Sequence, residues 1–368
     1  MKMKLTTAIV VIGLLASNAF SYGPAGHHMV GAIADRRLAK LNSNVAAKVN
    51  SLLDGLSLAD AALLPDEIKD WDPNGPTPLS RLVSHPRIQQ ELADYWTANH
   101  TMVEGQALHR VYHFTDVPVL DAEKYADGTV GRADHDLVHL IPFCIAVLQA
   151  PDNTDNERKI TKSVAIILLA HYLGDIHQPL HVGAEYFAKV PHHKARPTNP
   201  DQGGAFFIDE GGNNLNLSLL KNGNPVVTGK VLHGYWDGTA ANTALGLMQD
   251  QFKSAHPEHV QKATEEELAQ EFAELEPAEW NLLPELAVKD WAEAWANDIL
   301  PEAREAHQRL SFDVKIALKH GRKEAVGTAT EIEMPDGISY RDWSGKVAMT
   351  EIHKGGWRLA ALLAKIVQ

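Results

Sequence analysis

The chain has little cysteine and no excess of positive charge. Cys144 is its only cysteine, which excludes an intramolecular disulfide. Its 34 lysine and arginine residues face 47 acidic residues, so the formal net charge is −13. Proteins that bind long stretches of nucleic acid usually carry a basic surface that replaces phosphate counterions. If this chain handles phosphate groups, the contact must therefore be local, and bound cations must supply the positive charge.

Several motifs typical of phosphate binding and nucleophilic catalysis are also missing. The sequence contains no glycine-rich loop that could cradle phosphates, no G-x-S-x-G elbow and no cysteine–histidine pattern typical of a thiol nucleophile. It shows no internal repeat at the spacing of solenoid proteins. Histidine, in contrast, is abundant, with 19 residues. The 368 residues, 45% of them hydrophobic, suffice for a large core in one big domain or two small ones.

The N-terminus has the pattern of a signal peptide. Lys2 and Lys4 precede an apolar stretch over residues 8–16, and residues 19–21 form a small-x-small cleavage site. Cleavage would remove residues 1–21 and make Tyr22 the first residue, with two positive charges fewer. An uncleaved anchor helix is the alternative, but the apolar stretch is short for a membrane span. No later stretch is long and apolar enough to cross a membrane, so we expect an exported, soluble protein, periplasmic or secreted.

Residues 171–181, which read HYLGDIHQPLH, contain the densest set of candidate metal ligands in the sequence. They end an apolar run with the periodicity of a buried helix. His171 and Asp175 are four residues apart, so they share one helix face about 6 Å along its axis. Pro179 stops or bends the helix, and His181 lies just beyond it. Imidazole and carboxylate suit zinc or a similar divalent ion. Taken alone, the stretch also fits a His–Asp pair satisfied at a helix end.

Similar residues recur along the chain. His233 and Asp237 repeat the four-residue spacing, and Asp66 follows a helix-breaking proline. His113 and Asp116 lie three apart in HRVYHFTDVPV, where alternation predicts a short strand. Each has a plain structural alternative: Asp66 as a helix N-cap, or His113 as a half-buried strand histidine.

The N-terminus that the predicted cleavage would create offers further candidate metal ligands. Turn residues at the start of the mature chain precede a predicted helix, and His27 lies in its first turn. A free α-amine at residue 22 could hold one metal ion together with His27. A frayed terminus with an incidental histidine is the alternative.

Hydrophobic periodicity predicts a mainly α-helical protein. Helices are predicted at residues 155–175, 240–254, 263–275, 285–310 and 341–367, and an apolar helix interrupted at Pro142 is predicted at residues 134–150. Residues 183–203 are predicted as a polar loop. One β-hairpin is predicted over residues 203–220 with its turn at Gly211-Gly212, and a second at residues 312–334.

These residues carry a resemblance to a known family. YGPAGH, LPDEIK, YHFTD, HYLGDIHQPLH, GGNN and LHGYWD occur in this order. The series resembles that of the zinc-dependent type I nucleases, the single-strand nucleases and 3′-nucleotidases of fungi, plants and some bacteria. The resemblance covers nearly the whole chain after residue 21, including a closing helix HKGGWRLAALLAKI. It implies one domain over residues 22–368 with the helical bundle of the zinc phospholipase C and nuclease fold.

The resemblance also implies a three-zinc cleft and a role for each matching residue. One zinc ion would bind Asp66, His113 and His171, with Asp175 shared. A second would bind the amine and carbonyl of Tyr22, His27 and the other oxygen of Asp175; a third would bind His181, His233 and Asp237. Asp116 would orient the attacking water, and Asn213 would contact the substrate. The implied activity is hydrolysis of single-stranded RNA and DNA to 5′-phosphate products, with 3′-nucleotidase activity, by a monomer that has no membrane partner.

The chain departs from the family pattern in three respects. Tyr22 replaces the usual starting tryptophan, and the disulfides of fungal and plant members are impossible. Residues 73–107 and 311–340 are longer than expected and are interpreted as insertions near the cleft. Two other functions compete with the nuclease: a zinc phospholipase C, which shares the three-zinc plan, and a non-catalytic exported metal-binding protein.

Overall fold

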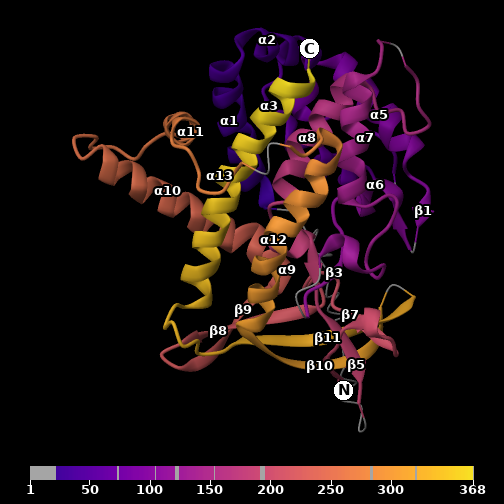
Figure 1. Cartoon of the computed structure of the whole chain (residues 1–368), viewed down its shortest axis with the longest axis vertical. Helices are drawn as coiled ribbons and strands as arrows, with labels where there is room; N and C mark the ends of the chain where they lie inside the picture. Colours follow the sequence, from indigo (N-terminus) through magenta and orange to yellow (C-terminus); the bar gives the residue numbers. More distant parts are fainter. Residues whose placement is uncertain are drawn as a thin grey trace, which may run out of the picture.

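The structure is a computed structural model that describes residues 22–367, apart from residues 73, 104, 121–123, 153, 191–194, 282–284 and 320. The predicted signal peptide lies outside the described residues. Helices fill the upper and middle parts of the molecule, and a four-stranded sheet lies at its lower end (Figure 1). The predicted mainly α-helical fold is confirmed. No helix within the described ranges is long and apolar enough to cross a membrane.

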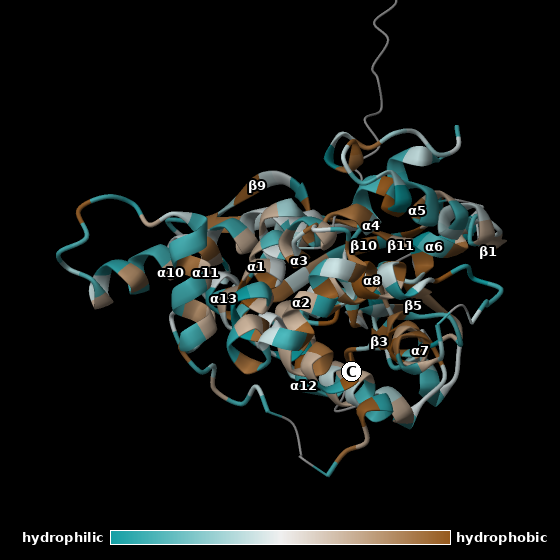
Figure 2. Ribbon diagram, turned by 90° about the horizontal axis from the view of Figure 1, so that it is seen from above, coloured by the Kyte–Doolittle hydropathy of each residue, from teal (hydrophilic) through white to brown (hydrophobic). Residues whose placement is uncertain are grey.

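Helix α8 (Lys162–Asp175) forms the centre of a first hydrophobic core. Its side chains are buried from Ser163 to Asp175, because the sequence is apolar around the whole helix. Thr161 caps the helix by accepting the N–H of Val164. Hydrophobic residues concentrate on the neighbouring α7 (Figure 2). Among the helices that contribute to this core are α2 (Ser43–Leu52), α3 (Leu58–Ala61), α4 (Leu64–Glu67), α5 (Pro86–Ala98), α6 (Leu108–Val111) and α7 (Leu137–Gln149).

A second core forms around the long helix α13 (Tyr340–Ile366), which packs against α1 (Gly23–Leu41). The two helices approach closely, since a Cβ added at Gly356 would lie 2.6 Å from a methyl carbon of Ile33. Helices α9 (Leu232–Tyr235), α10 (Ala241–Ala255) and α11 (Glu265–Glu274) lie beside them, and α12 (Trp291–Gln308) reaches both cores. The helices predicted near 240–254, 263–275, 285–310 and 341–367 are therefore present.

A four-stranded sheet closes the lower end of the second core (Figure 1). Its strand order is β10-β11-β8-β9, in which β10 (Leu310–Lys319) and β11 (Arg322–Glu331) form the predicted second hairpin. β8 (Leu215–Lys221) pairs antiparallel with β9 (Asn224–Val231) and parallel with β11. Short sheets also join β1 (Met102–Val103) to β2 (Gln106–Ala107), β3 (Val117–Pro118) to β4 (Gly183–Ala184), and β5 (Tyr186–Lys189) to β6 (Ala195–Pro197) and β7 (Phe206–Ile208).

Some local predictions were wrong. The first hairpin does not form, because β7 pairs with β5 while β8 pairs with β9 and β11. β5 and β6 lie in the segment predicted as a loop. The predicted strand around His113 is largely replaced by α6, since Tyr112 is buried in the first core and bonds Asn99. Such short segments are ambiguous between the two periods. The predicted interruption at Pro142 is absent: α7 continues through this residue, whose missing N–H removes one hydrogen bond of the helix.

The two cores meet around the end of α8. Tyr112 and Tyr172 belong to the first core, whereas Leu232 and Trp236 belong to the second. Each of these apolar residues is next in sequence to a predicted metal ligand. The fold therefore brings the predicted ligands to the boundary between the cores.

Candidate metal centre

Asp175, on the last turn of α8, is the most shared residue of the centre. One carboxylate oxygen, Oδ2, lies 3.0 Å from Nδ1 of His113 and 3.3 Å from Nε2 of His171. The other oxygen, Oδ1, lies 3.4 Å from Nε2 of His27 on α1. A carboxylate has two oxygens and can hold two cations close together. The two oxygens face different imidazoles, and the bridging of two metal ions by Asp175 stays a prediction.

Asp66 completes the first ligand group. It follows Pro65 in α4, and its Oδ1 lies 3.6 Å from Nε2 of His171. The ligand atoms of Asp66, His113 and His171 all lie within 4.8 Å of one another, as do those of His27, His171 and Asp175. The structure thus brings together the side chains predicted for the first two zinc ions.

The third predicted group also assembles. Nε2 of His181 lies 3.1 Å from Nε2 of His233, and His233 Nε2 lies 3.6 Å from an oxygen of Asp237. His181 ends the short helix η4 (Pro179–His181), His233 lies on α9, and Asp237 lies in the π-helical turn η7 (Trp236–Ala240). Single π-turns inside helices occur often at functional sites.

Backbone carbonyls orient three of the imidazoles. Nδ1 of His171 lies 2.7 Å from the carbonyl of Ala62, Nδ1 of His181 lies 2.8 Å from that of His113, and Nδ1 of His233 lies 2.9 Å from that of Gly211. A proton on Nδ1 satisfies each contact and leaves Nε2 as a lone-pair donor. This second hydrogen bond is the usual arrangement of metal-binding histidine.

Burial keeps these imidazoles neutral. It lowers the pKa of His181 to about 3 and that of His233 to about 4, and it lowers the pKa of His171 well below its usual value. A neutral imidazole is the form that binds a metal ion. The pKa of Asp237 is raised by burial, which penalises a carboxylate without a cation.

Several buried polar atoms have no hydrogen-bond partner. Within the ligand groups they are both ring nitrogens of His27, Oδ1 of Asp175 and Oδ2 of Asp237. Buried polar atoms are rarely unpaired in native proteins, and each needs an explanation. Divalent cations bound to these nitrogen and oxygen atoms would provide it, so the residues fit the zinc ions that the sequence predicts.

Two glycines make room for the ligands. A Cβ at Gly174 would lie 2.4 Å from Nδ1 of His27, so only glycine lets α1 approach α8 here. Gly211 has a φ of 56°, and a Cβ there would lie 2.4 Å from the carbonyl oxygen of Leu180. Steric crowding therefore explains why glycine stands at Gly174 and Gly211, in the GD and GG pairs of the sequence motifs.

Tyr22 is fully buried at the start of α1. Its hydroxyl donates to the carbonyl of His177 at 2.7 Å, and its own carbonyl accepts the N–H of Gly26 at 3.1 Å. Burial raises the pKa of its hydroxyl, and nearby Glu351 and Asp237 add to the effect. The first residue after the predicted cleavage site thus lies close to the third ligand group. Metal binding by its amine and carbonyl stays a prediction.

Asp116 and Asn213 lie outside the ligand groups. Asp116 lines a cavity of about 350 Å³, and burial, with the charges of Asp209 and Glu210, raises its pKa to about 8. Asn213 is half-buried, and its side-chain amide donates to the carbonyl of Glu210 at 3.1 Å. The roles in water orientation and substrate contact stay predictions.

Sequence reasoning missed three positioning residues. Nζ of Lys69 lies 2.6 Å from Asp66, Nε2 of Gln178 donates to Asp237 at 2.9 Å, and the buried guanidinium of Arg358 lies 2.9 Å from Nε2 of His177. Lys69 and Gln178 lie inside the motifs LPDEIK and HYLGDIHQPLH, which could have signalled them. Arg358 lies inside the closing-helix motif HKGGWRLAALLAKI, but no local pattern linked it to His177, which is far away in the sequence.

The comparisons with known proteins agree with this geometry. The family model described as S1/P1 Nuclease matches residues 22–368. The chain is 24% identical to Endonuclease 1 of Arabidopsis thaliana over 376 residues, which cover 98% of this chain and 93% of the relative. It is 24% identical to Endonuclease 5 over 69% of this chain and 67% of the relative, and 26% identical to Endonuclease 4 over 64% and 61%, both from the same plant. The chain therefore belongs to the S1/P1 nuclease family, and it is a phosphodiester hydrolase of the endonuclease type that acts on nucleic acid.

Proposed function

We propose that the protein is an exported endonuclease that uses three zinc ions to cut single-stranded RNA and DNA into 5′-phosphate products, and that it also removes the phosphate of 3′-nucleotides. The observation that carries the proposal is the arrangement around Asp175. Its two oxygens face different imidazoles, and the third group of His181, His233 and Asp237 lies nearby, with His181 Nδ1 3.9 Å from Asp175.

The side chains have distinct tasks in this proposal. Bound zinc ions would lower the pKa of an attacking water and neutralise charge on the phosphate. Burial raises the pKa of Asp116 to about 8, within reach of the pH at which a carboxyl exchanges a proton with water efficiently. Lys69 is paired with Asp66 and only 11% exposed, so its ammonium adds positive charge at the edge of the ligand groups.

A base would enter the cavity beside Asp116. Its lining includes the aromatic rings of Phe114, Tyr186, Phe206 and Phe207. Gly131 also lines the cavity and lies against the backbone carbonyl of Asp116. Aromatic rings stack on any base, which requires that the base leaves its duplex stack first. The cavity therefore supports a preference for single strands.

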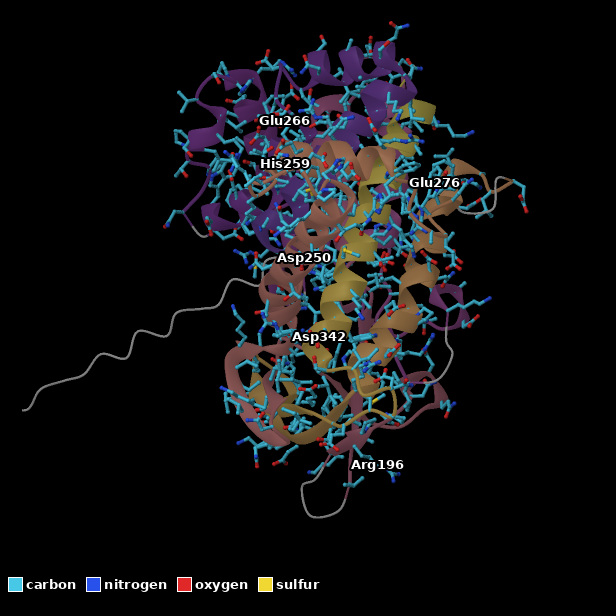
Figure 3. The ribbon with its side chains drawn as sticks, turned by 90° about the vertical axis from the view of Figure 1, so that its left-hand side faces the viewer. Arg196, Asp250, His259, Glu266, Glu276 and Asp342 are labelled. Atoms are coloured by element: carbon cyan, nitrogen blue, oxygen red, sulfur yellow. The ribbon has the colours of Figure 1, made fainter. Side chains whose placement is uncertain are left out.

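The surface charge favours local contact with the substrate. The labelled acidic residues Asp250, Glu266, Glu276 and Asp342 are exposed and spread over the molecule (Figure 3). A long nucleic acid footprint on such a surface would be unfavourable. Positive charge from ions held at the buried centre would concentrate attraction there.

Export is part of the proposal. The match to the family begins at residue 22, which supports removal of residues 1–21. N-terminal sequencing of the protein recovered outside the cytoplasm should begin at Tyr22. A mature protein that retains residues 1–21 would contradict this processing.

The function is tested with the processed protein and Asp175→Asn. The wild type should hydrolyse single-stranded DNA, RNA and 3′-AMP far faster than duplex DNA. Asp175→Asn should lose activity on all of them and at least one zinc by mass spectrometry, because an amide cannot bridge two cations as an anion. Asp313→Asn, on an exposed strand position, serves as the control and should behave as wild type. Hydrolysis of phosphatidylcholine without nuclease activity would favour the phospholipase function instead.

A further inference from the structure

A further group of histidine and aspartate side chains lies outside the centre described above. Asp72 follows η1 (Ile68–Trp71), His100 follows α5, and His109 lies on α6. Oδ1 of Asp72 lies 3.0 Å from Nδ1 of His100, and Nε2 of His109 lies 3.3 Å from both carboxylate oxygens. One ligand atom from each residue lies within 4.8 Å of the other two.

These separations match those expected around a metal ion. Ligand atoms about 2.0 Å from a tetrahedral zinc ion are about 3.3 Å apart. The ligand groups of the candidate metal centre show the same spacing. Nε2 of His171 lies 3.3 Å from Oδ2 of Asp175, and the Nε2 atoms of His181 and His233 lie 3.1 Å apart. Nδ1 of His100 is buried and makes no hydrogen bond, the condition also found for Oδ1 of Asp175.

The chemistry of the three residues suits a borderline divalent ion. His109 is almost fully buried, and burial lowers its pKa to about 4 although Asp72 opposes the shift, so the ring is neutral. Trp96 Nε1 donates to Oδ1 of Asp72 at 3.1 Å and orients the carboxylate. His100 is 36% exposed and stacks on Trp96, so solvent reaches the group from this side and a water can complete the coordination.

The guanidinium of Arg110 competes with a metal ion for the carboxylate of Asp72. Its Nε donates to Oδ2 of Asp72 at 2.6 Å. The candidate metal centre contains a similar pair, since Nζ of Lys69 lies 2.6 Å from Oδ1 of Asp66. A basic partner on the carboxylate is therefore found in both groups. Oδ1 of Asp72, which already accepts the N–H of Trp96, keeps a further lone pair for a metal ion.

We infer that Asp72, His100 and His109 form an additional binding site for a zinc-like divalent cation, separate from the three groups of the catalytic centre. Its position suggests a structural task. Asp72 lies six residues after Asp66, and His109 lies four residues before His113, so the same two segments supply both sites. His100 belongs to the segment at residues 73–107. The cation would join that segment to the segments that carry catalytic ligands. The inference does not depend on the proposed substrates.

The test counts bound metal in variants that leave the catalytic ligands in place. His100→Ala, after dialysis against zinc and then metal-free buffer, should contain one zinc equivalent less than the wild type by mass spectrometry. The control is His256→Ala. His256 is 37% exposed and lies 3.1 Å from Glu271, so it matches His100 in exposure and pairing but belongs to no such group among the described residues. It should retain the wild-type zinc content.

Arg110→Gln separates a metal site from a plain ion-pair network. Removal of the guanidinium frees Oδ2 of Asp72, so a metal site should bind Co²⁺ more tightly, by about tenfold, in a titration followed by visible absorption. The same titration of His100→Ala should lack this binding step. Equal zinc content in His100→Ala and wild type, or loss of a metal equivalent in Arg110→Gln, would overturn the inference, and neither result would bear on nuclease activity.

Discussion

Lys69 contributes charge to the centre without being a candidate ligand. Its ammonium is paired with Asp66, and it also lowers the pKa of His113, His181 and His233, whose main pKa shift comes from burial. It is therefore close to more than one ligand group. A phosphate that approaches the centre would meet this ammonium.

Lys69→Met should lower kcat by about 100-fold, the cost of removing one charge-stabilising donor, while zinc content stays unchanged. Steady-state kinetics on a single-stranded oligonucleotide and metal analysis measure the two effects. Lys162→Met removes a lysine that pairs with Asp152, also at 2.6 Å, and should leave kcat unaltered. If Lys69→Met loses zinc in proportion to activity, Lys69 only supports Asp66.

His307 gives the fold a pH-dependent ion pair. Its Nδ1 lies 2.8 Å from the carbonyl of Ala303, and its Nε2 lies 3.3 Å from Asp209. Only the protonated ring donates to both. Burial opposes the charge, but Asp209 and Glu185 outweigh it and raise the pKa of His307. The pair therefore stabilises the fold fully below the unfolded-state pKa and loses this effect as pH rises through the folded-state pKa.

His307→Gln should destabilise the protein by about 3 kcal/mol at pH 6, as expected when one partner of a buried pair is removed, and by less at pH 9. Denaturant unfolding at the two pH values measures the difference. His353→Gln is the control with the opposite slope, because burial lowers the pKa of His353 and so favours its neutral ring in the fold. A cost for His307→Gln that is equal at both pH values would contradict the assignment.

The ligand residues could be predicted individually because they lie in short motifs with fixed spacing. His171 and Asp175 share a helix face, and so do His233 and Asp237. Residues that act through distant partners could not be predicted in this way. The link from Arg358 to His177 joins chain segments 181 residues apart, and only the tertiary structure creates it.

The contact between α1 and α8 shows how helices position the centre. His27 stacks on His171 with ring centroids 3.9 Å apart, and Gly174 provides the space for the His27 ring. A side chain at position 174 would push α1 away. The pairing of His27 with Asp175 depends on this close approach.

Gly174→Ala should therefore lower activity by about 100-fold, in line with the effect of an ångström-scale misplacement, and it should weaken binding of the zinc ion that His27 and Asp175 would share. Gly246→Ala is the matched control. Gly246 lies on an exposed face of α10, nothing lies within 4 Å of an added Cβ, and the change should stabilise the helix by about 0.5–1 kcal/mol. Zinc titration calorimetry and activity assays distinguish the variants. Wild-type zinc affinity in Gly174→Ala would contradict this account.

Long elements were predictable and short ones were not. The helices α10 to α13 and the β10–β11 hairpin follow from sustained periodicity. β5, β6 and β7 are short, and their pairing depends on segments that no local pattern connects. The same limit explains the wrong prediction at α6.

Over the whole molecule, the candidate centre joins two hydrophobic cores. Asp66, His113 and His171 lie beside residues of the first core, whereas His233 and Asp237 lie beside residues of the second. Cations bound at the centre would stabilise the native state by mass action, about 4 kcal/mol per site when their concentration is 1,000 times Kd.

Removal of metal with a chelator should lower Tm by roughly 10 °C and abolish activity, and zinc should restore both. Differential scanning calorimetry with and without chelator measures the shift. Hydrogen exchange should rise most at α4, α8 and α9, which carry ligands. An unchanged Tm together with full activity in the presence of a chelator would show that no metal supports this fold.

The boundary position of the ligands also has a consequence for biosynthesis. A chain in which only one core has formed holds part of the donor set and cannot build the complete centre. Hydrolytic competence is then acquired only at the last step of folding. Immature or damaged molecules would remain harmless to nucleic acids, and activity per molecule would serve as a direct measure of the fully folded fraction in a preparation.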